Sequence, residues 1–370
     1  MLLSEDLAYL LQFMDGSHSA LDLRAAYMRR FGSFLFEEQL AQLLRMLDEQ
    51  LLLDNERFAR YRREIEEAFR RAPVRESAHA GQSYPADPEE LRQQLGSYYQ
   101  DAKSSSPAYE GAAPGGVKGC VVPHIDLRAG GRTYGHAYRW LAAAGPADLY
   151  VVLGTCHGPL PSFCAGTRKH FNTPFGLARS DQSFMDALAR QWGEDLYLGE
   201  LAHRSEHTIE FQVIFLQHLF GAEVHIAPLL FAFSPADVLA ENDSGKRIRE
   251  FAEALRAVSQ AFAGRLIMVA SADLSHVGPR YGDLWSVDRN RLAVVRQHDQ
   301  ELLKFVLEGN AEAMVQTLAS SGDRFRVCGF PPIYTMLKAM DVQGGVVLDH
   351  RHAYMDESGS VVTFAAVVLF

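Results

Sequence analysis

The sequence Gly-Cys-Val-Val-Pro-His-Ile-Asp-Leu-Arg-Ala-Gly-Gly, residues 119–131, decides the fold of the larger part of the chain. The β-branched pair Val121 and Val122 is halted by Pro123, and His124 follows in a polar segment that ends in two glycines. This order predicts a buried strand, then a histidine just past its end, and then a loop.

The same order occurs twice more in the chain. The apolar run 149–153 leads to His157, and the apolar run 266–270 leads to His276. In open α/β sheets, ligands bind in the crevice outside the carboxyl ends of the strands, where side chains that are distant in sequence converge. The sequence therefore predicts one site that contains His124, His157 and His276.

Extended and helical patterns alternate after residue 119, which is typical of a mostly parallel central sheet with helices on both faces. We therefore expect an α/β fold of the larger domain, with an antiparallel hairpin at its end. The predicted strands end at 122 and span 149–153, 223–230, 266–270, 346–354 and 361–370. The predicted helices span 134–143, 181–192, 207–220, 246–262, 287–308, 311–318 and 331–340.

Residues 1–60 form a separate pattern of three short helices followed by a Leu-Leu-Leu strand at 51–53. This pattern predicts a winged-helix-like helical module, and its order resembles the small peptide-chaperone domain of pyrroloquinoline-quinone biosynthesis. A helical docking or dimerisation domain is the alternative interpretation. We expect residues 61–78 to be a helical connector and residues 79–370 to be the α/β domain.

The composition excludes several classes of function. The net charge of -10 over 370 residues argues against a nucleic-acid-binding protein. The four cysteines contain no CxxC pair, so a disulfide framework or a zinc ribbon is not expected. The start lacks the basic region of a signal peptide, and no apolar run approaches the ~20 residues of a membrane span. We expect a cytoplasmic protein without membrane contact.

A fourth candidate, Cys328, lies in the segment 326–332, which reads as a loop that opens a helix. Imidazole nitrogen and thiolate sulfur suit iron, copper or zinc rather than magnesium or calcium. The helix N-terminus is expected to lower the pKa of the thiol and favour the thiolate. For each histidine alone, a structural role is the more frequent explanation, but three strand-end histidines together favour a functional site.

Carboxylates accompany these residues. Asp273 precedes His276 by three positions, and the spacing of Glu206 and Glu210 places both acids on one face of a helix. Acids in a first helical turn ordinarily interact with the helix dipole. The functional alternative is that Glu206 and Glu210 lie behind the metal ligands, where a carboxylate accepts the N–H of a metal-bound histidine.

The remaining candidates favour structural roles. We expect His350 and His352 to be exposed on the terminal hairpin and His136 to pack on a helix. Cys156 is interpreted as wall or core, and Cys120 and Cys164 as buried and inert. The sequence has no GxGxxG, Walker, GxSxG or HExxH motif, which removes the commonest nucleotide, serine-hydrolase and metalloprotease interpretations.

Six ordered motifs resemble the Memo family, also called AmmeMemoRadiSam system protein B, over about residues 79–370. They are AGQSYPADP at 80–88, VPH at 122–124, VLGTCH at 152–157, EHTIEFQ at 206–212, SADLSH at 271–276 and CGFPPI at 328–333. The resemblance implies a fold similar to class III extradiol dioxygenases. It implies that His124, His157 and Cys328 ligate iron or copper, with His276 as an acid/base residue and Asp273 beside it.

Two departures from the family, at 125–127 and in the Thr155-Cys156-His157-Gly158 context of the second histidine, and one difference from the dioxygenases limit what the resemblance implies. Ile125-Asp126-Leu127 follows the first histidine where the family usually has Ala-Gly-Tyr, which leaves the lining of the substrate pocket open. A cysteine replaces the carboxylate that a dioxygenase would use, so ring cleavage does not carry over.

We therefore expect a metal-dependent oxidoreductase with iron or copper, zinc being a further option, that acts on an unidentified small molecule or peptide. The alternative is a binding module in which the same cleft recognises a peptide or protein while residues 1–60 dock a partner. Metal-assisted hydrolysis is a third class. It is the least favoured, because Cys328 suits redox chemistry better.

Overall fold

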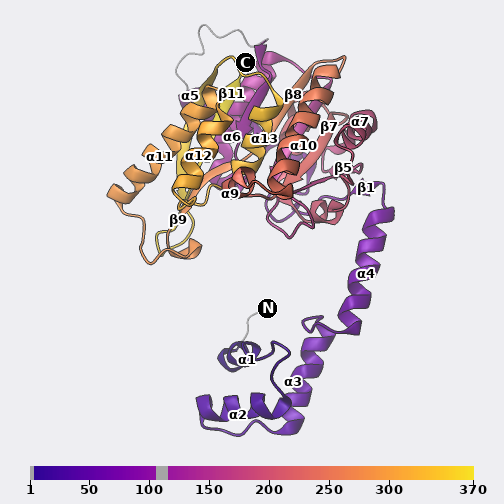
Figure 1. Cartoon of the computed structure of the whole chain (residues 1–370), viewed down its shortest axis with the longest axis vertical. Coiled ribbons are helices and arrows are strands. Elements are labelled where there is room, and N and C mark those ends of the chain that lie inside the picture. Colours follow the sequence, from indigo (N-terminus) through magenta and orange to yellow (C-terminus); the bar gives the residue numbers. More distant parts are fainter. Residues whose placement is uncertain (1–3, 106–115) are drawn as a thin grey trace. The chain divides into compact units, whose positions relative to one another are not determined.

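The computed structural model describes residues 4–105 and 116–370. The chain divides into two compact units, Met1–Arg71 and Ala72–Phe370, whose elements are labelled in Figure 1. Within the described residues, no helix is both long enough and apolar enough to cross a membrane.

The smaller unit is helical. The helices α1 (Glu5–Leu11), α2 (Ala20–Phe31) and α3 (Glu37–Glu49) pack around Leu10, Leu23 and Leu40. Ser19 forms a capping box at the start of α2, where a side-chain oxygen satisfies a backbone N–H that has no helical partner. The charged helix α4 (Glu56–Arg71) follows, and none of its residues is buried.

The strand predicted at 51–53 is wrong, and the winged-helix architecture is not confirmed. Leu51 has a left-handed φ of 59°, which interrupts an extended backbone. The backbone N–H of Leu52 donates to the carbonyl of Leu47, so it closes the end of α3. The three leucines therefore terminate a helix, and the described residues of this unit contain no strand.

The larger unit is built on one sheet whose described strands follow the order β1-β5-β6-β7-β3-β8-β2-β11-β10, with β4 beside β7 and β9 beside β11. The central neighbours β7, β3, β8 and β2 are parallel, and β11 is antiparallel to β2 and to β10. The strands are β1 (Val74–Arg75), β2 (Gly119–Val122), β3 (Leu149–Thr155), β4 (Cys164–Gly166), β5 (His170–Thr173), β6 (Gly176–Ser180), β7 (His225–Phe231), β8 (Leu266–Ser271), β9 (Asp273–Val277), β10 (Gly345–Tyr354) and β11 (Val361–Leu369). The α/β fold, the parallel centre of the sheet and the terminal hairpin are confirmed, whereas β4, β5, β9, β10 and β11 add antiparallel pairs.

Two hydrophobic cores lie on opposite faces of this sheet, because successive side chains of a strand point to opposite sides. Val121 belongs to one core, and its neighbours Cys120 and Val122 belong to the other. The first core is covered by α7 (Gln182–Trp192), α9 (Pro235–Leu239), α10 (Asp243–Ala261), α11 (Arg289–Leu307), α12 (Ala311–Ser320) and α13 (Phe330–Ala339). The second is covered by α5 (Pro88–Ser105), α6 (Leu127–Ala144) and α8 (His207–Phe220).

The loop predicted after His124 is wrong, because α6 begins at Leu127. Asp126 caps this helix by accepting a hydrogen bond from the backbone N–H of Arg128. Glycines therefore lie inside the helix, and a Cβ at Gly131 would collide with the ring of Tyr98 on α5. These glycines permit close packing of α5 and α6. A run of glycines is also typical of a loop, so the sequence alone did not distinguish the two structures.

The sequence also missed β1, β4, β5, β6 and β9, which are too short to show a clear strand pattern. The strand β9 matters for the site, since Asp273 and His276 lie on it rather than on a loop. It pairs antiparallel with β11, with His276 opposite Val362.

The larger unit begins at Ala72, seven residues before the expected start of the α/β domain. Val74 and Arg75 form β1, which pairs parallel with β5. The side chain of Arg75 is buried and binds residues near the start of α8.

Candidate metal centre

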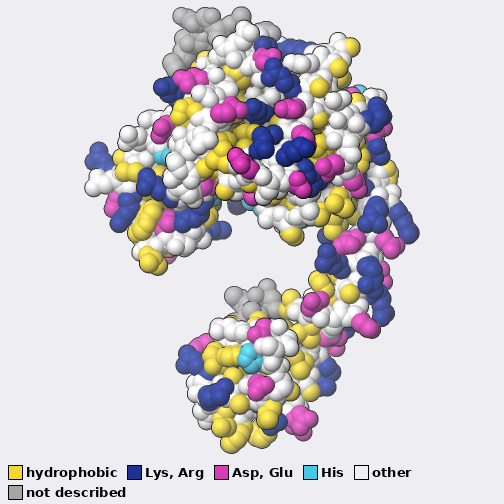
Figure 2. All heavy atoms as spheres, in the orientation of Figure 1, with side chains coloured by type: hydrophobic (Ala, Val, Ile, Leu, Met, Phe, Trp, Pro, Cys, Tyr) yellow, Lys and Arg dark blue, Asp and Glu magenta, His cyan; other side chains and the backbone are white. Residues whose placement is uncertain are grey.

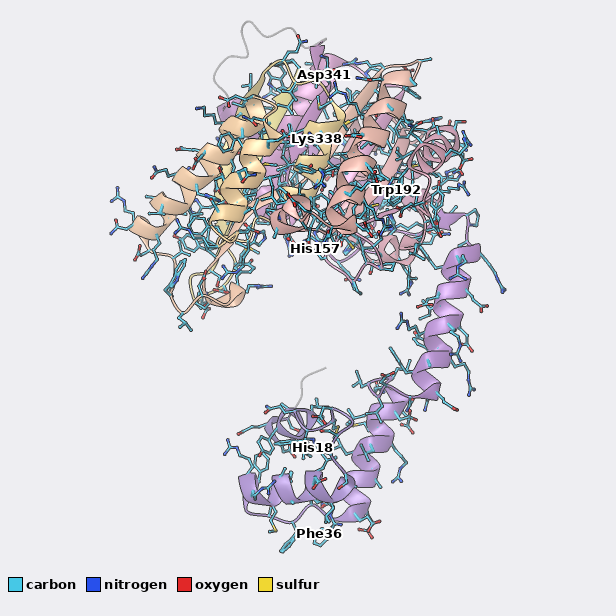
Figure 3. All side chains as sticks on the ribbon, in the orientation of Figure 1. His18, Phe36, His157, Trp192, Lys338 and Asp341 are labelled. Carbon is cyan, nitrogen blue, oxygen red and sulfur yellow. The ribbon has the colours of Figure 1, made fainter. Side chains whose placement is uncertain are left out.

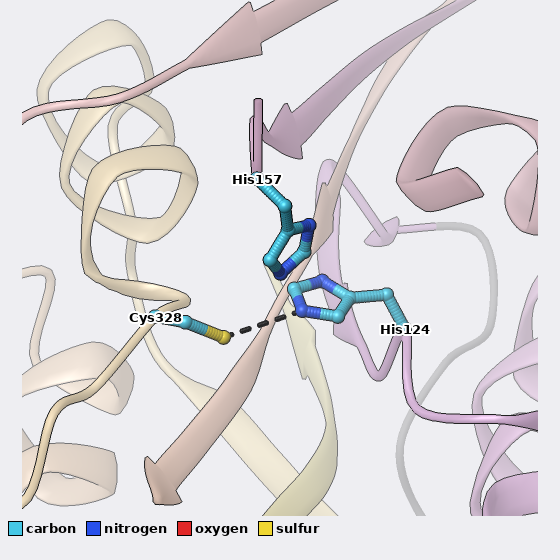
Figure 4. Close-up of side chains that lie close together, drawn as sticks. All are labelled: His124, His157 and Cys328. Atoms are coloured by element: carbon cyan, nitrogen blue, oxygen red, sulfur yellow. Dashed lines mark hydrogen bonds between the residues drawn. The ribbon is translucent and has the colours of Figure 1, made fainter. Parts of the chain in front are cut away.

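His124, His157 and Cys328 converge on one point although more than 200 residues separate the first from the last (Figure 4). One ligand atom from each side chain lies within 4.8 Å of the others. The Sγ of Cys328 is 3.2 Å from the Nε2 of His124, and the two imidazole centroids are 5.1 Å apart. The predicted convergence of these three residues is confirmed.

The sheet topology explains this convergence. Both β2 and β3 pair in parallel with β8, which lies between them, so their carboxyl ends reach the same edge of the sheet. His124 and His157 each follow the last strand residue by two positions. Cys328 precedes α13, and two hydrogen bonds hold its loop: Thr155 Oγ1 donates to its carbonyl, and the N–H of Gly329 donates to that of Asp273.

The tautomers of both histidines are set by partners behind them. Nδ1 of His124 lies 3.0 Å from the carbonyl oxygen of Ser271, and Nδ1 of His157 lies 3.1 Å from Glu206 Oε1. Because a carbonyl or carboxylate oxygen accepts, each Nδ1 carries the proton and each Nε2 offers a lone pair. This is the arrangement that orients metal-bound histidines in proteins.

The spacing fits a transition-metal ion. With metal–sulfur and metal–nitrogen bonds of zinc-like length, two ligands lie ~3.1 Å apart at a right angle and ~3.6 Å apart at the tetrahedral angle. The observed distance of 3.2 Å between Cys328 Sγ and His124 Nε2 falls within this interval. Two imidazoles and a sulfur form a donor set for iron, copper or zinc.

Burial controls the charges at this centre. It lowers the pKa of His124 well below its usual value, and the neighbouring His157 and His207 add to this effect. Burial also opposes the protonation of His157, but the Glu206 carboxylate outweighs it and raises the pKa. His124 is therefore neutral and ready to ligate at neutral pH, whereas His157 is held by a carboxylate.

The predicted lowering of the Cys328 pKa is wrong. Burial raises the pKa of this thiol well above its usual range, and the nearby carboxylate of Asp273 adds to the shift. Cys328 lies one residue outside the N-cap of α13, where the helix dipole does not compensate for the loss of water. Coordination to a metal cation is what would deprotonate this thiol.

Asp273 and His276 both lie on β9, and Asp273 contacts His124 directly. Among the described residues, the groups that could hold a metal do not include His276. Oδ1 of Asp273 accepts hydrogen bonds from the backbone N–H groups of His124 and Ile125, and its Oδ2 is 3.7 Å from His124 Nε2. Burial raises the pKa of Asp273 to about 6. Burial lowers the pKa of His276 to about 4, and the charge of His157 contributes to this shift.

The model of the Memo-like proteins matches residues 75–368, which is most of the chain. The chain belongs to the Memo family. It is 29% identical to a MEMO1 family protein of Aquifex aeolicus over 99% of this chain and 91% of that protein. It is 30% identical to a MEMO1 family protein of Thermus thermophilus over 89% of this chain and 92% of that protein.

Among solved structures, an uncharacterized protein of Escherichia coli K12 matches 69% of this chain and all of its own chain, at 15% identity and a TM-score of 0.39. The Memo family match begins at Arg75, the residue that ties β1 to α8, and the Aquifex relative also aligns with the smaller unit.

The two glutamates of the EHTIE motif in this Memo chain have different positions. Glu206 caps α8 and lies behind His157, as the functional interpretation expected. Glu210 is fully buried and accepts hydrogen bonds from Arg75, from the hydroxyl of Tyr84 and from two backbone N–H groups at 78 and 79. None of these partners is a ligand candidate, so Glu210 anchors the start of the larger unit.

The sequence reasoning missed His207 in the same motif. Its ring stacks on that of His157 at a centroid distance of 5.0 Å, and it lies 5.5 Å from the ring of His124. Its Nδ1 is 3.0 Å from Glu206 Oε1. The adjacency of a histidine to Glu206 was the available signal, but only the packing of α8 shows that it faces the site.

The expected exposure of the hairpin histidines is wrong. The side chain of His350 is 11% exposed, and its Nε2 is 3.2 Å from a carboxylate oxygen of the buried Asp299. Because α11 packs on β10, this histidine lies under a helix. His352 is half-buried. Cys156, Cys120, Cys164 and His136 are buried, as expected.

Proposed function

We propose that this Memo protein is a metal-dependent oxidoreductase whose iron, or alternatively copper, is held by His124, His157 and Cys328. The observation that carries the proposal is the meeting of the three ligand atoms within 4.8 Å. A soft thiolate beside two imidazoles favours a redox metal over magnesium or calcium. Bound there, the metal would supply electron transfer to or from a substrate.

The protein groups provide proton transfer and orientation in this proposal. His276 is neutral at pH 7, because burial lowers its pKa to about 4. Its Nδ1 lies 3.1 Å from the Leu274 carbonyl oxygen, so this nitrogen carries the proton. The ring of Tyr281 packs edge-on against it at 5.1 Å. His276 would therefore act as a base, while Asp273 holds the backbone that carries His124.

Metal analysis of protein purified without oxygen tests the proposal. We expect wild-type protein to retain iron or copper, and the variants His124→Ala and Cys328→Ser to lose it. Cys156→Ser is the matched control, since this buried cysteine adjoins His157 and its thiol donates to the Gly158 carbonyl. Unchanged metal content in both ligand variants would refute the ligand set. Metal that cannot be oxidised and reduced in the wild type would refute the redox function.

The smaller unit supports a second candidate function, docking of a protein partner. Its surface carries large hydrophobic side chains, shown in yellow in Figure 2. Leu21 is 70% exposed, Phe34 is 72% exposed and Phe36, labelled in Figure 3, is 59% exposed. Large apolar groups with this degree of exposure are found at interaction surfaces.

Substitution on this surface tests the second function without removing the unit. If docking is the function, the full chain with Phe34→Ser and Phe36→Ser will lose a co-purifying partner that wild type retains. Leu239→Ser is the control, because Leu239 is 41% exposed on the larger unit. Retention of the partner by the double variant would refute docking through this surface. We also propose a reducing, cytoplasmic location, in keeping with four free cysteines.

A further inference from the structure

We propose that His157, Glu206 and His207 form a second metal site beside the first, suited to a divalent ion such as zinc or copper(II). One ligand atom from each of the three side chains lies within 4.8 Å of the other two. The site shares His157 with the proposed redox centre but adds Glu206 and His207, neither of which is a ligand of that centre. It does not depend on redox activity.

The distances fit coordination. A metal with nitrogen and oxygen bonds of zinc-like length places the two ligand atoms ~2.9 Å apart at a right angle and ~3.4 Å apart at the tetrahedral angle. Nδ1 of His157 is 3.1 Å from Glu206 Oε1, and Nδ1 of His207 is 3.0 Å from the same oxygen. The two imidazole rings are stacked, with planes 21° from parallel, and the Nδ1 atom of each lies near this one oxygen.

The hydrogen bonding at Glu206 gives an independent reason. Oε1 also lies 2.9 Å from the backbone N–H of His207 and 3.3 Å from that of Thr208. Four potential donors therefore surround one oxygen, although each carboxylate oxygen offers about two lone-pair positions. The backbone N–H groups cannot leave, because they form the cap of α8. A cation that binds both Nδ1 atoms and the carboxylate removes this excess of donors.

The shared histidine uses a different nitrogen for each site. His157 directs Nδ1 at Glu206, and its Nε2 is the nitrogen left to join His124 and Cys328. Binding at Nδ1 displaces the proton there, and this proton passes to solvent. When both sites are filled, the ring bridges them as an imidazolate, and each nitrogen donates one lone pair.

The two proposed sites differ in the solvent exposure of their side chains. The side chain of His157 is 44% exposed and that of His207 is 28% exposed, whereas the side chain of His124 is 3% exposed. Figure 3 labels His157 at the edge of the larger unit. Ions therefore reach the proposed second site from the His157 and His207 side, because Glu206 itself is only 5% exposed, and the His124 side of the pair is enclosed.

Cobalt(II) titration of the full chain, after removal of metals with a chelator, tests the second site. Cobalt bound to Cys328 gives a thiolate-to-metal charge-transfer band, and cobalt at the second site does not. We expect wild type to bind two cobalt ions per chain, one with this band. His207→Gln should bind one ion and keep the band, and Cys328→Ser should bind one ion without the band.

The matched control is His79→Gln, which removes an imidazole 5.7 Å from His207 that is engaged with the carbonyl of Ser205. It should still bind two ions. Binding by wild type of a single ion that gives the band would overturn the proposal even if His207→Gln fails to fold. Equal stoichiometry in wild type and His207→Gln, or loss of an ion in His79→Gln, would also overturn it. Absence of the band in wild type would instead count against the proposed redox centre alone.

Discussion

Glu210→Gln should destabilise the larger unit strongly, because Glu210 is the only carboxylate among the hydrogen-bond partners that the structure gives to the buried Arg75. The side chains are 0% and 1% exposed, respectively. The guanidinium also donates to the carbonyls of His203 and Glu206. These carbonyls lie beside the cap of α8, so the ion pair fixes the segment that places Glu206 behind His157.

The magnitude follows from the acceptors that are lost. Four donors converge on the two oxygens of Glu210, and glutamine keeps one oxygen and adds an N–H group that faces these donors. Removing one partner of a buried ion pair costs ~3–5 kcal/mol, because the other charge stays buried without a counter-charge. We expect a loss of this size in the free energy of unfolding.

Denaturant unfolding monitored by tryptophan fluorescence measures this loss. All three tryptophans of the chain, Trp140, Trp192 and Trp285, lie in the larger unit, so the signal reports on that unit. In the presence of Arg75→Met, Glu210→Gln should lower the free energy of unfolding by less than it does alone. The expected coupling energy between the two substitutions is ~1–3 kcal/mol.

The control is Glu89→Gln, which removes the carboxylate of an exposed pair with Arg92 and should leave the unfolding midpoint unchanged. The reasoning is refuted if Glu210→Gln costs less than ~1 kcal/mol, the lower limit for leaving a buried group without its partner. It is also refuted if the two substitutions at Arg75 and Glu210 prove additive.

Two further predictions concern the site and the pH dependence of stability. Glu206→Gln should weaken metal binding at Cys328 by ~10–100-fold, because the charge that orients His157 is lost, as chelator competition would show. Burial lowers the pKa of His203 to about 3, against 6.5 for an exposed histidine, so its contribution to stability is complete above about pH 6.5 and declines as the pH falls toward 3. Between pH 7 and pH 5 this one group should cost ~2 kcal/mol, and His203→Gln should remove that part of the pH dependence measured by denaturant unfolding.

Asp181→Asn is the control for Glu206→Gln, because Asp181 caps α7 in the same way without an imidazole partner at the metal site. Equal affinity in wild type and Glu206→Gln would contradict the role assigned to the carboxylate. For His203, the same dependence on pH in variant and wild type would show that this histidine is not the group that titrates.

The sequence predicted the sheet and most of its helices because their patterns are local. Buried parallel strands such as β3 and β8 are continuous apolar runs, and the terminal hairpin carries its own turn. The strand-end positions of His124 and His157 follow directly from the lengths of these runs. The convergence of His124 with His157 could be predicted, since parallel strands bring their carboxyl ends to one edge. Cys328 lies in a loop before α13, and the family resemblance implied its place beside them.

The sequence patterns that led to wrong predictions are each compatible with more than one local structure. Glycines at 130, 131 and 135 indicate a loop in isolation, but the structure uses them for contact between α5 and α6. The leucines at 51–53 have the composition of a strand, yet their backbone groups close α3. In both cases a neighbour that is absent from the local sequence decides the outcome.

The sequence by itself determined the α/β architecture, the edge at which the site forms and the residues able to ligate a metal, because apolar periodicity and donor chemistry are properties of single segments. Only the tertiary structure decided that Glu206 binds His157 whereas Glu210 binds Arg75, and that His207 joins the site. Residues four apart on one helix share a face, but which partner meets each of them depends on the elements packed against α8. Burial, which sets the pKa of Cys328, arises in the same way from the whole fold.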